Sequence, residues 1–519
     1  MRTLRIAIAT AVSPVLVLCA SAPSLPVVEL DYSTVQAVDG NATLGYYKYQ
    51  NIRFAKVPTG DLRFAAPEWP EFETEINNGT TFAEADVTCK TSEDCLYLDV
   101  WAPASSDGRK LPVMVWSHGG RFILGSKTEV TPEGLFDLTQ DFVYVAYNYR
   151  LGITGVATSP TYQHEGGVSN LCIWDATHAF KWVKKYIGKF GGDPNDVTAV
   201  GFSAGGSQIA FQMTRFGGNA PQLFDKAYIM SPGYLPGAGH YQAEQFWQNV
   251  STAVGCNDGH LDCLRQVSYD RLVNASNTLV SAYKYTLQPR VDGYILPDTW
   301  EASVYQGHFN FSGPVVLSHA RHEFNSVAHT SVDTEEDIPT TLRDIFPAIS
   351  DKAIEQILKL HPADDYESAG IRFADMKQSY EVSSKNLALT NSMQNATWNA
   401  EVGLSPAVHG TDQSYYFYST YKLSAESENA ANVSAAEAAS VGAVTSTVNS
   451  TTARMMQKYL LSFVLTGNPN TMWADDKIYW PRYNESSVGT QIVFNDTFSI
   501  ADDVLANAKS LFWNKALWY

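Results

Sequence analysis

The stretch Val197–Gly206, VTAVGFSAGG, places Ser203 in the pattern glycine-x-serine-x-glycine. A run of β-branched and small apolar residues precedes this serine, and a helix-compatible segment, AGGSQIAFQM, follows it. The order predicts a tight strand–turn–helix that exposes the serine hydroxyl, with glycines permitting the turn. A serine hydroxyl is a weak nucleophile at neutral pH. It therefore needs a histidine base, an acid that orients the base, and backbone N–H donors for the oxyanion.

The elements that must position such a serine are visible as short apolar runs between helical patterns. The segment Leu171–Lys189 has helical spacing and lies between two of these runs. Several runs are continuously apolar, which is typical of strands covered by helices on both faces. The pattern predicts an α/β protein with a central, mostly parallel sheet flanked by helices. The runs are LYLDVWAP, LPVMVWSHGG, FVYVAYNYRLG, VTAVGFS, KAYIMS and GPVVLSHA.

Two longer segments carry a resemblance to a known family. EDCLYLDVWAP (Glu93–Pro103) matches one family signature at every position, and FGGDPNDVTAVGFSAG (Phe190–Gly205) matches the other except at Ala199, where a larger aliphatic residue is usual. The chain resembles the type-B carboxylesterase/lipase family, which are cholinesterase-like α/β-hydrolases, and within it a secreted fungal member. The resemblance implies an α/β-hydrolase fold in a single domain, residues 23–519. It also implies hydrolysis of a small-molecule ester without a cofactor. Further pieces in family order are GDLRFAAP, WSHGGRF, NYRLG, VDGYILPD and LTGNPN.

The resemblance implies a catalytic triad at three named positions. The family nucleophile corresponds to Ser203 in the glycine-flanked turn. The family acid corresponds to Glu323 in VVLSHARHEFNS, and the family histidine corresponds to His409 in AVHGTDQSYYFY. The chain order serine, acid, histidine is the one expected for this fold.

The oxyanion hole implied by the resemblance departs from the family pattern at one position. Its donors would be the N–H of Ala204 and those of Gly120 and Arg121 in HGGRF, where the family usually has a third glycine in place of Arg121. An arginine N–H can still donate if its backbone angles suit a residue with a Cβ. The Arg121 side chain would then project to the pocket rim, where we expect it to attract a substrate carboxylate.

Other departures from the family cluster near the expected site. Phe202 replaces the usual glutamate before the serine, Phe324 replaces the usual glycine after the acid, and Ser231 is retained within MSPGY. Two interpretations remain open: neutral drift, or a more apolar pocket with weaker electrostatic support for the histidine. His118 and His322 are further candidates to line the pocket. No metal is expected, because no three ligands have metal-binding spacing.

The N-terminus has the pattern of a secretory signal peptide. Arg2 and Arg5 precede an apolar run over residues 6–18, and small residues follow at 20–22. This predicts a signal peptide over residues 1–22, because the run is too short to anchor the chain in a membrane. Ten N-x-S/T sequons predict N-linked glycans on a secreted protein. The sequon asparagines are Asn41, Asn78, Asn249, Asn274, Asn310, Asn395, Asn432, Asn449, Asn484 and Asn495.

Cysteine usage and net charge agree with this compartment. The close pairs Cys89/Cys95 and Cys256/Cys263 predict two small disulfide loops. Cys172 lies in an apolar stretch with helical spacing, which predicts a buried, inert thiol. The 519 residues carry a formal net charge of −18, which argues against nucleic acid or a membrane as the partner.

The first disulfide loop bears on the size of the substrate. Only five residues separate Cys89 from Cys95. In family members that act as lipases or cholinesterases, the corresponding loop is long and forms a lid or a gorge wall. The short loop therefore predicts a lidless enzyme for soluble or modest-sized esters, without interfacial activation.

The sequence is compatible with three functions. The first is a secreted serine carboxylic-ester hydrolase that works through an acyl-enzyme. The second is an acyltransferase or cyclising enzyme that uses the same acyl-enzyme, which a water-poor pocket would favour. The third is a non-catalytic binding or adhesion protein on the same fold. It is disfavoured because such members typically lose a triad residue, whereas this chain keeps all three.

Overall fold

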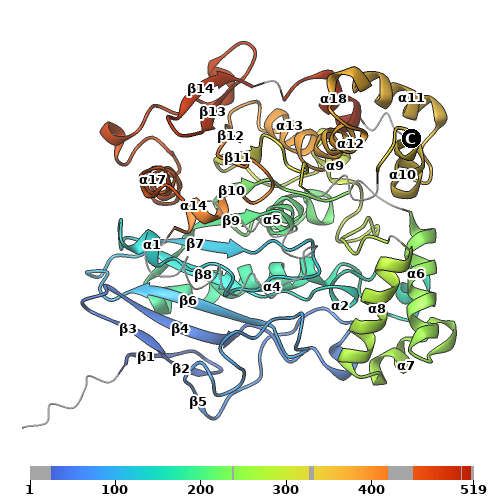
Figure 1. Ribbon diagram of the computed structural model, residues 1–519. Coiled ribbons are helices and arrows are strands. Elements are labelled where there is room, and N and C mark those ends of the chain that lie inside the picture. Colours follow the sequence, from blue (N-terminus) through green and yellow to red (C-terminus); the bar gives the residue numbers. More distant parts are fainter. Residues whose placement is uncertain are drawn as a thin grey trace, which may run out of the picture.

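The structure is a computed structural model that describes residues 25–235, 239–283, 285–326, 332–418, 448–503 and 505–515. The expected signal peptide, residues 1–22, lies outside this range. Within the described residues, the largest sheet has 11 strands in the order β14-β13-β12-β11-β10-β9-β7-β8-β6-β4-β3 (Figure 1). A smaller sheet of three strands has the order β1-β2-β5.

All neighbouring pairs from β13 to β8 are parallel, and antiparallel strands flank them at both edges. The prediction of a mostly parallel central sheet is confirmed. Each apolar run found in the sequence coincides with a strand. The strands of the large sheet are β3 (Asp39–Asn41), β4 (Tyr46–Arg53), β6 (Tyr97–Pro103), β7 (Leu111–Ser117), β8 (Val143–Tyr147), β9 (Gly192–Phe202), β10 (Lys226–Met230), β11 (Val315–Ala320), β12 (Trp398–Val402), β13 (Thr490–Phe494) and β14 (Ser499–Asp502). Those of the small sheet are β1 (Val27–Glu29), β2 (Thr34–Gln36) and β5 (Ile76–Asn77).

Helices cover both faces of the large sheet, as the continuously apolar strands predict. The α-helices of the described residues are α1 (Glu133–Phe136), α2 (Ile153–Val156), α3 (Pro160–His164), α4 (Leu171–Tyr186), α5 (Ala204–Thr214), α6 (His240–Ala253), α7 (Leu261–Gln266), α8 (Tyr269–Tyr283), α9 (Trp300–Tyr305), α10 (Asp337–Ile345), α11 (Asp351–Leu360), α12 (Ala369–Gln378), α13 (Ser384–Ser392), α14 (Gln413–Tyr416), α17 (Ser450–Thr466) and α18 (Ala508–Asn514). The predicted helix at 171–189 corresponds to α4 and the short 3-10 turn that follows it.

Alternation along β7 shows how the two faces are filled. Val113 and Val115 pack with α4 and α5 in one apolar cluster, whereas Met114 and Trp116 pack with α14 and α17 in another. Successive side chains of a strand point to opposite faces, so a fully buried strand contributes to two cores. A third cluster joins α10–α12 and the π-helical turn Ser379–Ser383 with α18.

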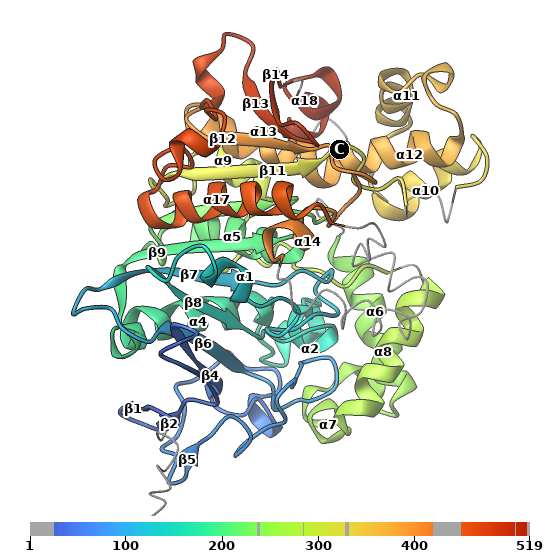
Figure 2. The ribbon, with the colours of Figure 1, turned by 60° about the vertical axis from the view of Figure 1, so that its left-hand side comes forward.

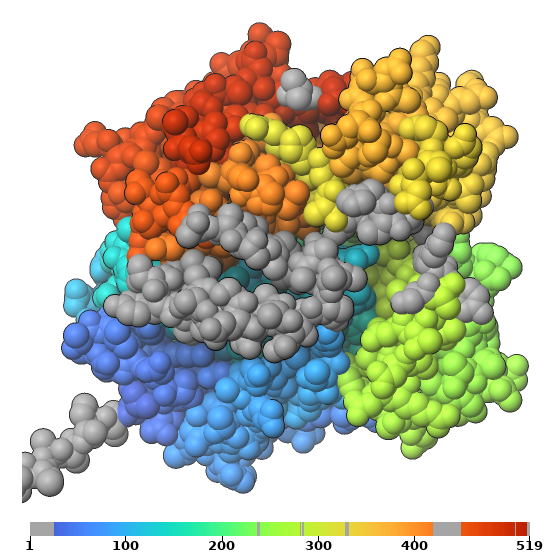
Figure 3. All heavy atoms as spheres, viewed as in Figure 1, coloured from blue at the N-terminus to red at the C-terminus, as the bar shows by residue number. Residues whose placement is uncertain are grey.

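The remaining helices gather at one end of the sheet. In Figures 1 and 2, α6–α8 and α10–α12 lie beyond the end toward which β7 and β11 point. Figure 3 shows the residues of α6–α8 (green) and of α10–α12 (gold) as two lobes on that same side. The carboxyl ends of parallel strands are where open α/β sheets place their ligand sites.

Both predicted disulfides are present, Cys89–Cys95 and Cys256–Cys263, with Cα–Cα distances of 5.0 and 5.6 Å. Cys172 is a buried free cysteine, and burial raises the pKa of its thiol, so it is unreactive at neutral pH. No helix among the described residues combines the length and the apolar character that a membrane crossing requires.

Candidate active site

Ser203 stands at the turn between β9 and α5. Its backbone angles, φ 55° and ψ −121°, lie outside the regions that ordinary residues adopt, as expected for a strained turn that presents a side chain. The turn is tight because α5 begins against the end of β7. A Cβ on Gly205 would collide with the backbone oxygen of Ser117, so only glycine allows this approach.

The structure brings Ser203, His409 and Glu323 into one hydrogen-bonded chain. His409 Nε2 lies 2.8 Å from Ser203 Oγ, and His409 Nδ1 lies 2.6 Å from Glu323 Oε2. An ionised carboxylate only accepts hydrogen bonds, so Nδ1 carries the imidazole proton and Nε2 is left to accept from the serine hydroxyl. This tautomer is the one that a general base for Ser203 requires.

Backbone and side-chain hydrogen bonds hold the acid and the histidine in register. Glu323 follows β11 in a fully buried turn, where its Oε1 accepts from the N–H of Ala320 at 2.6 Å. The N–H of His409 donates to the carbonyl of Glu323 at 3.0 Å. The N–H of Glu323 donates to Oε1 of Gln378, the last residue of α12, at 3.1 Å. The turn after β11, the end of α12 and the loop that holds His409 therefore together set the orientation of the histidine.

The sequence predicts three backbone N–H groups as donors to the oxyanion. Those of Ala204, Gly120 and Arg121 donate no hydrogen bond within the described part of the chain. The loop that holds Gly120 passes close to the nucleophile, since a Cβ on Gly119 would lie 3.2 Å from Ser203 Cβ. The sequence-based choice of donors is compatible with this geometry.

Arg121 has a backbone conformation that favours glycine. Its φ is 56°, in the left-handed region, which costs a residue with a Cβ about 1 kcal/mol. The backbone angles of Arg121 therefore do not suit a residue with a Cβ, and placing its N–H in the oxyanion hole costs conformational energy. Its side chain is exposed.

Two aromatic rings flank the imidazole of His409. The centre of the Phe202 ring lies 4.7 Å from that of His409, and the Phe324 ring lies 5.6 Å away in a stacked orientation. Both phenylalanines are buried. Phe202 and Val200 belong to the same apolar cluster, so strand alternation in β9 directs Phe202 toward the face where His409 lies.

A family model described as the carboxylesterase family matches residues 24–512. This chain belongs to the carboxylesterase family. It is 26% identical to Carboxylesterase patB of Penicillium expansum, over 86% of this chain and 89% of that protein. It is also 26% identical to Secreted lipase 4 of Gibberella zeae, over 90% of this chain and 87% of that protein.

The crystal structure of Aspergillus niger EstA is similar in fold, with a TM-score of 0.79 and 21% sequence identity. The similarity covers 96% of this chain and 99% of EstA. The expected α/β-hydrolase fold is confirmed. Family membership supports hydrolysis of carboxylic esters, and hence small-molecule esters as substrates.

The two rings around His409 give this carboxylesterase a testable electrostatic property. We expect Phe202→Glu to move the acid limb of the kcat/KM–pH profile upward by about one pH unit, because a carboxylate beside the ring stabilises the imidazolium form. Phe202→Gln has a similar shape without the charge and serves as the matched control, for which the limb should stay in place. The measurement is kcat/KM on a neutral ester from pH 5 to 9. An acid limb that is the same in both variants would mean that residue 202 has no electrostatic influence on the base.

The remaining pocket candidates lie at different depths in the carboxylesterase. His118 is buried beneath the oxyanion loop and stacks on Tyr149 with ring centres 4.3 Å apart. Burial lowers its pKa to about 4, so it is neutral at physiological pH. Ser231 is buried at the end of β10, and its N–H donates to the carbonyl of Ser318 at 3.0 Å. His322 is exposed beside Glu323. Among the described residues, the side-chain hydrogen bonds and ring contacts of His409 involve Ser203, Glu323, Phe202 and Phe324, not these three.

Two charged groups near the triad escaped the sequence analysis. Asp412, three residues after His409, is 2% exposed, and burial raises its pKa to about 6. Lys377, in the last turn of α12, has its ammonium 4.4 Å from the centre of the Phe324 ring. Asp412 is visible in the sequence beside the histidine motif, but its burial is not. Lys377 belongs to a helix whose position no motif indicates.

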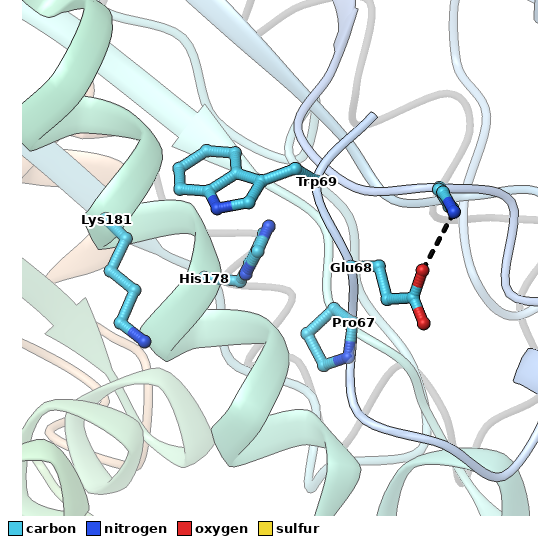
Figure 4. A pocket seen from close by; sticks show the side chains of 6 residues that line it. Pro67, Glu68, Trp69, His178 and Lys181 are labelled. Carbon is cyan, nitrogen blue, oxygen red and sulfur yellow. Dashed lines mark hydrogen bonds and ion pairs between the residues drawn. The ribbon is translucent and has the colours of Figure 1, made fainter. Parts of the chain in front are cut away.

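A separate hollow of about 530 Å³ lies between α4 and the segment before β5 (Figure 4). Trp69 and His178 face each other in it, with ring centres 4.5 Å apart, and Lys56 pairs with Glu68 at its edge at 2.8 Å. Burial lowers the pKa of His178 to about 4. The described residues that line the hollow include no serine or cysteine.

Proposed function

We propose that the protein is a serine carboxylic-ester hydrolase that works through an acyl-enzyme. Ser203 attacks the ester carbonyl while His409 accepts its proton, and Glu323 keeps the imidazole in the required tautomer. The oxyanion receives hydrogen bonds from the N–H groups of Ala204, Gly120 and Arg121. His409 then protonates the leaving alcohol, and water hydrolyses the acyl-enzyme with His409 again as the base. The observation that carries the proposal is the hydrogen-bonded chain from Glu323 through His409 to Ser203.

We further propose a secreted, N-glycosylated protein whose mature part, residues 23–519, is a single domain. The predicted signal peptide, the two disulfides and the similarity to Secreted lipase 4 support secretion. The sequon asparagines in the described residues are all exposed or half-buried, as a glycan requires, and Asn432 lies outside those residues. The exposed ones are Asn41, Asn78, Asn274, Asn310, Asn449 and Asn484, and the half-buried ones are Asn249, Asn395 and Asn495.

The site is proposed to lack a lid made from the first disulfide loop. Ion pairs hold the five residues inside that loop, because Glu93 pairs with Arg63 and Asp94 pairs with Arg53. The Tyr269 hydroxyl donates to the carbonyl of Cys89 at the start of the loop. A loop held in this way does not move on and off a substrate, which favours soluble or modest-sized esters.

A second candidate is transfer of the acyl group to an alcohol or amine, including cyclisation. It is favoured by the apolar rings of Phe202 and Phe324, since an apolar pocket disfavours water as the acceptor. A non-catalytic binding function is disfavoured by the intact hydrogen-bonded chain.

The proposed function is tested by labelling with a fluorophosphonate probe. The wild-type protein should become labelled, the adduct should map to Ser203 by peptide mass spectrometry, and Ser203→Ala should remain unlabelled. Esters graded by acyl length, including a triglyceride below and above its solubility, should show turnover without a jump when droplets form. Adding a competing alcohol separates hydrolysis from transfer. Absence of labelling at Ser203 together with absence of ester turnover would contradict the proposal.

A further inference from the structure

Two cationic side chains lie at the edge of the proposed site. The Lys377 ammonium is 4.4 Å from the centre of the Phe324 ring, and that ring is 5.6 Å from the ring of His409. The ammonium-to-imidazole separation therefore cannot exceed the sum of these distances. The Lys377 side chain is only 20% exposed. Arg121, whose N–H is an oxyanion donor, contributes the second cation.

The charges of Arg121 and Lys377 are close enough to oppose each other. Burial lowers the pKa of the Lys377 ammonium, and the positive charge of Arg121 lowers it further. Within the described range, no carboxylate pairs with Arg121. Its left-handed backbone costs energy that a glycine would not, and what the residue adds in return is a guanidinium.

Two fully buried lysines of the protein are paired much more closely than the half-buried Lys377. Lys127 lies 2.7 Å from a carboxylate oxygen of Asp99, and Lys385 lies 3.0 Å from one of Glu301. The nearest carboxylate oxygen to Lys377 belongs to Glu381, at 3.8 Å. Buried charges are ordinarily paired and hydrogen-bonded, so a cation left at this distance has the capacity to bind another anion.

The carboxylates around the site do not fill this capacity. Glu323 is committed to His409 and to the N–H of Ala320. Glu381 lies one turn beyond Lys377, within the π-helical turn Ser379–Ser383. Such turns are rare and occur often at functional sites. In a protein whose net charge is −18, Lys377 thus has one carboxylate at 3.8 Å, and Arg121 pairs with none among the described residues.

We propose that Lys377 and Arg121 bind a free carboxylate on the substrate, so that the preferred substrates are esters carrying a second, unesterified carboxylate. The inference rests on the proposed ester hydrolysis at Ser203. The guanidinium can hold the carboxylate in a two-point contact while the ammonium adds a third hydrogen bond. The apolar part of the substrate between the two carboxyl groups would lie along the Phe324 ring.

The test compares matched esters that differ only in this charge. p-Nitrophenyl hemisuccinate against p-nitrophenyl butyrate places the carboxylate on the acyl side. 4-Carboxyphenyl butyrate against phenyl butyrate places it on the alcohol side. For one of the two pairs, wild type should show a kcat/KM ratio of charged to neutral ester above one. Lys377→Gln should lower that ratio about tenfold or more.

Two further variants and one solution condition sharpen the result. Lys377→Arg restores a cation and should retain most of the ratio, which a merely structural role would not explain. Lys352→Gln, on the exposed start of α11, removes the same charge from the outer surface and should leave both rates unchanged. Raising the salt concentration should lower the wild-type ratio.

The inference is overturned if neither charged ester is preferred, or if Lys377→Gln leaves the ratio as it is in wild type. Turnover of the neutral esters and labelling of Ser203 would in that case leave the proposed hydrolysis standing. Loss of both turnover and labelling in the wild-type protein would overturn the hydrolysis and the carboxylate preference together.

Discussion

Replacing Glu323 with glutamine should lower kcat on a neutral ester by about 10,000-fold while the fold is retained. The reason lies in the two partners of the carboxylate. Oε1 of Glu323 accepts from the N–H of Ala320, and Oε2 accepts from His409 Nδ1. In the variant the amide oxygen must still face the Ala320 N–H, so the NH₂ group faces His409. Nδ1 then has to accept, the imidazole proton moves to Nε2, and the base can no longer take the proton of Ser203.

The measurement is kcat with single-turnover controls, together with far-UV circular dichroism to verify folding. His409→Ala provides the comparison, because residues that act as one unit lose their effect together. The double variant Glu323→Gln/His409→Ala should therefore be scarcely slower than His409→Ala alone. A folded Glu323→Gln protein that loses less than about tenfold would contradict the assigned tautomer and the role of Glu323.

The spacing of apolar residues along the chain predicted many of the strands and helices of this fold. β7 and the second half of β9, residues 197–202, are mostly apolar runs because both faces of the sheet are covered, and their alternation is visible in the two clusters they join. The strand before Ser203 and the helix after it dictate the turn that presents the hydroxyl. For Glu323 and His409 the prediction came from resemblance to known motifs. Their contact is now visible in the structure, while their catalytic roles remain proposals.

Residues whose importance depends on packing between distant segments could not be found in this way. Lys377 and Gln378 end α12, which is separated from every motif by more chain than local patterns can bridge. Gln378 nevertheless accepts from the N–H of Glu323, and Lys377 lies over Phe324. The burial of Asp412 is equally invisible, because an acidic residue in a polar stretch looks solvent-exposed by composition.

The position of Phe202 shows where sequence and structure complement each other. The sequence identified it as a departure from the family, with drift and a reshaped pocket both open. The structure places its ring 4.7 Å from His409, so the substitution alters the surroundings of the base directly. A glutamate at this position would put a charge where the ring now excludes water. Asp412, three residues after His409, is a buried carboxylate whose charge also acts on the base.

Replacing Asp412 with asparagine should stabilise the protein above pH 6 by up to about 3 kcal/mol. Burial raises the pKa of this carboxyl from an ordinary value of 3.8 to about 6, and one carboxylate oxygen has no hydrogen-bond partner among the described residues. Below about pH 3 the group is neutral in both the folded and the unfolded state and contributes nothing. Between pH 4 and 6 the unfolded chain releases its proton first, so the free energy of unfolding falls as pH rises. Above pH 6 the whole penalty remains, and an asparagine removes it.

The stabilisation should be accompanied by a loss of activity. The positive charge of His409 lowers the pKa of Asp412, and by reciprocity the Asp412 carboxylate stabilises the imidazolium that forms during acylation. We therefore expect kcat of Asp412→Asn to fall several-fold at pH 8, where the wild-type group is ionised, and to approach the wild-type value near pH 5. Urea unfolding at about pH 3 and pH 8 measures the stability difference, and the acidic measurement is the internal control because residue 412 is then neutral in both proteins, folded and unfolded. Equal stability of the two proteins at pH 8 would show that residue 412 is not a strained buried carboxylate. If the variant is more stable but kcat is unchanged, Asp412 is a destabilising buried carboxylate that does not assist His409 in catalysis.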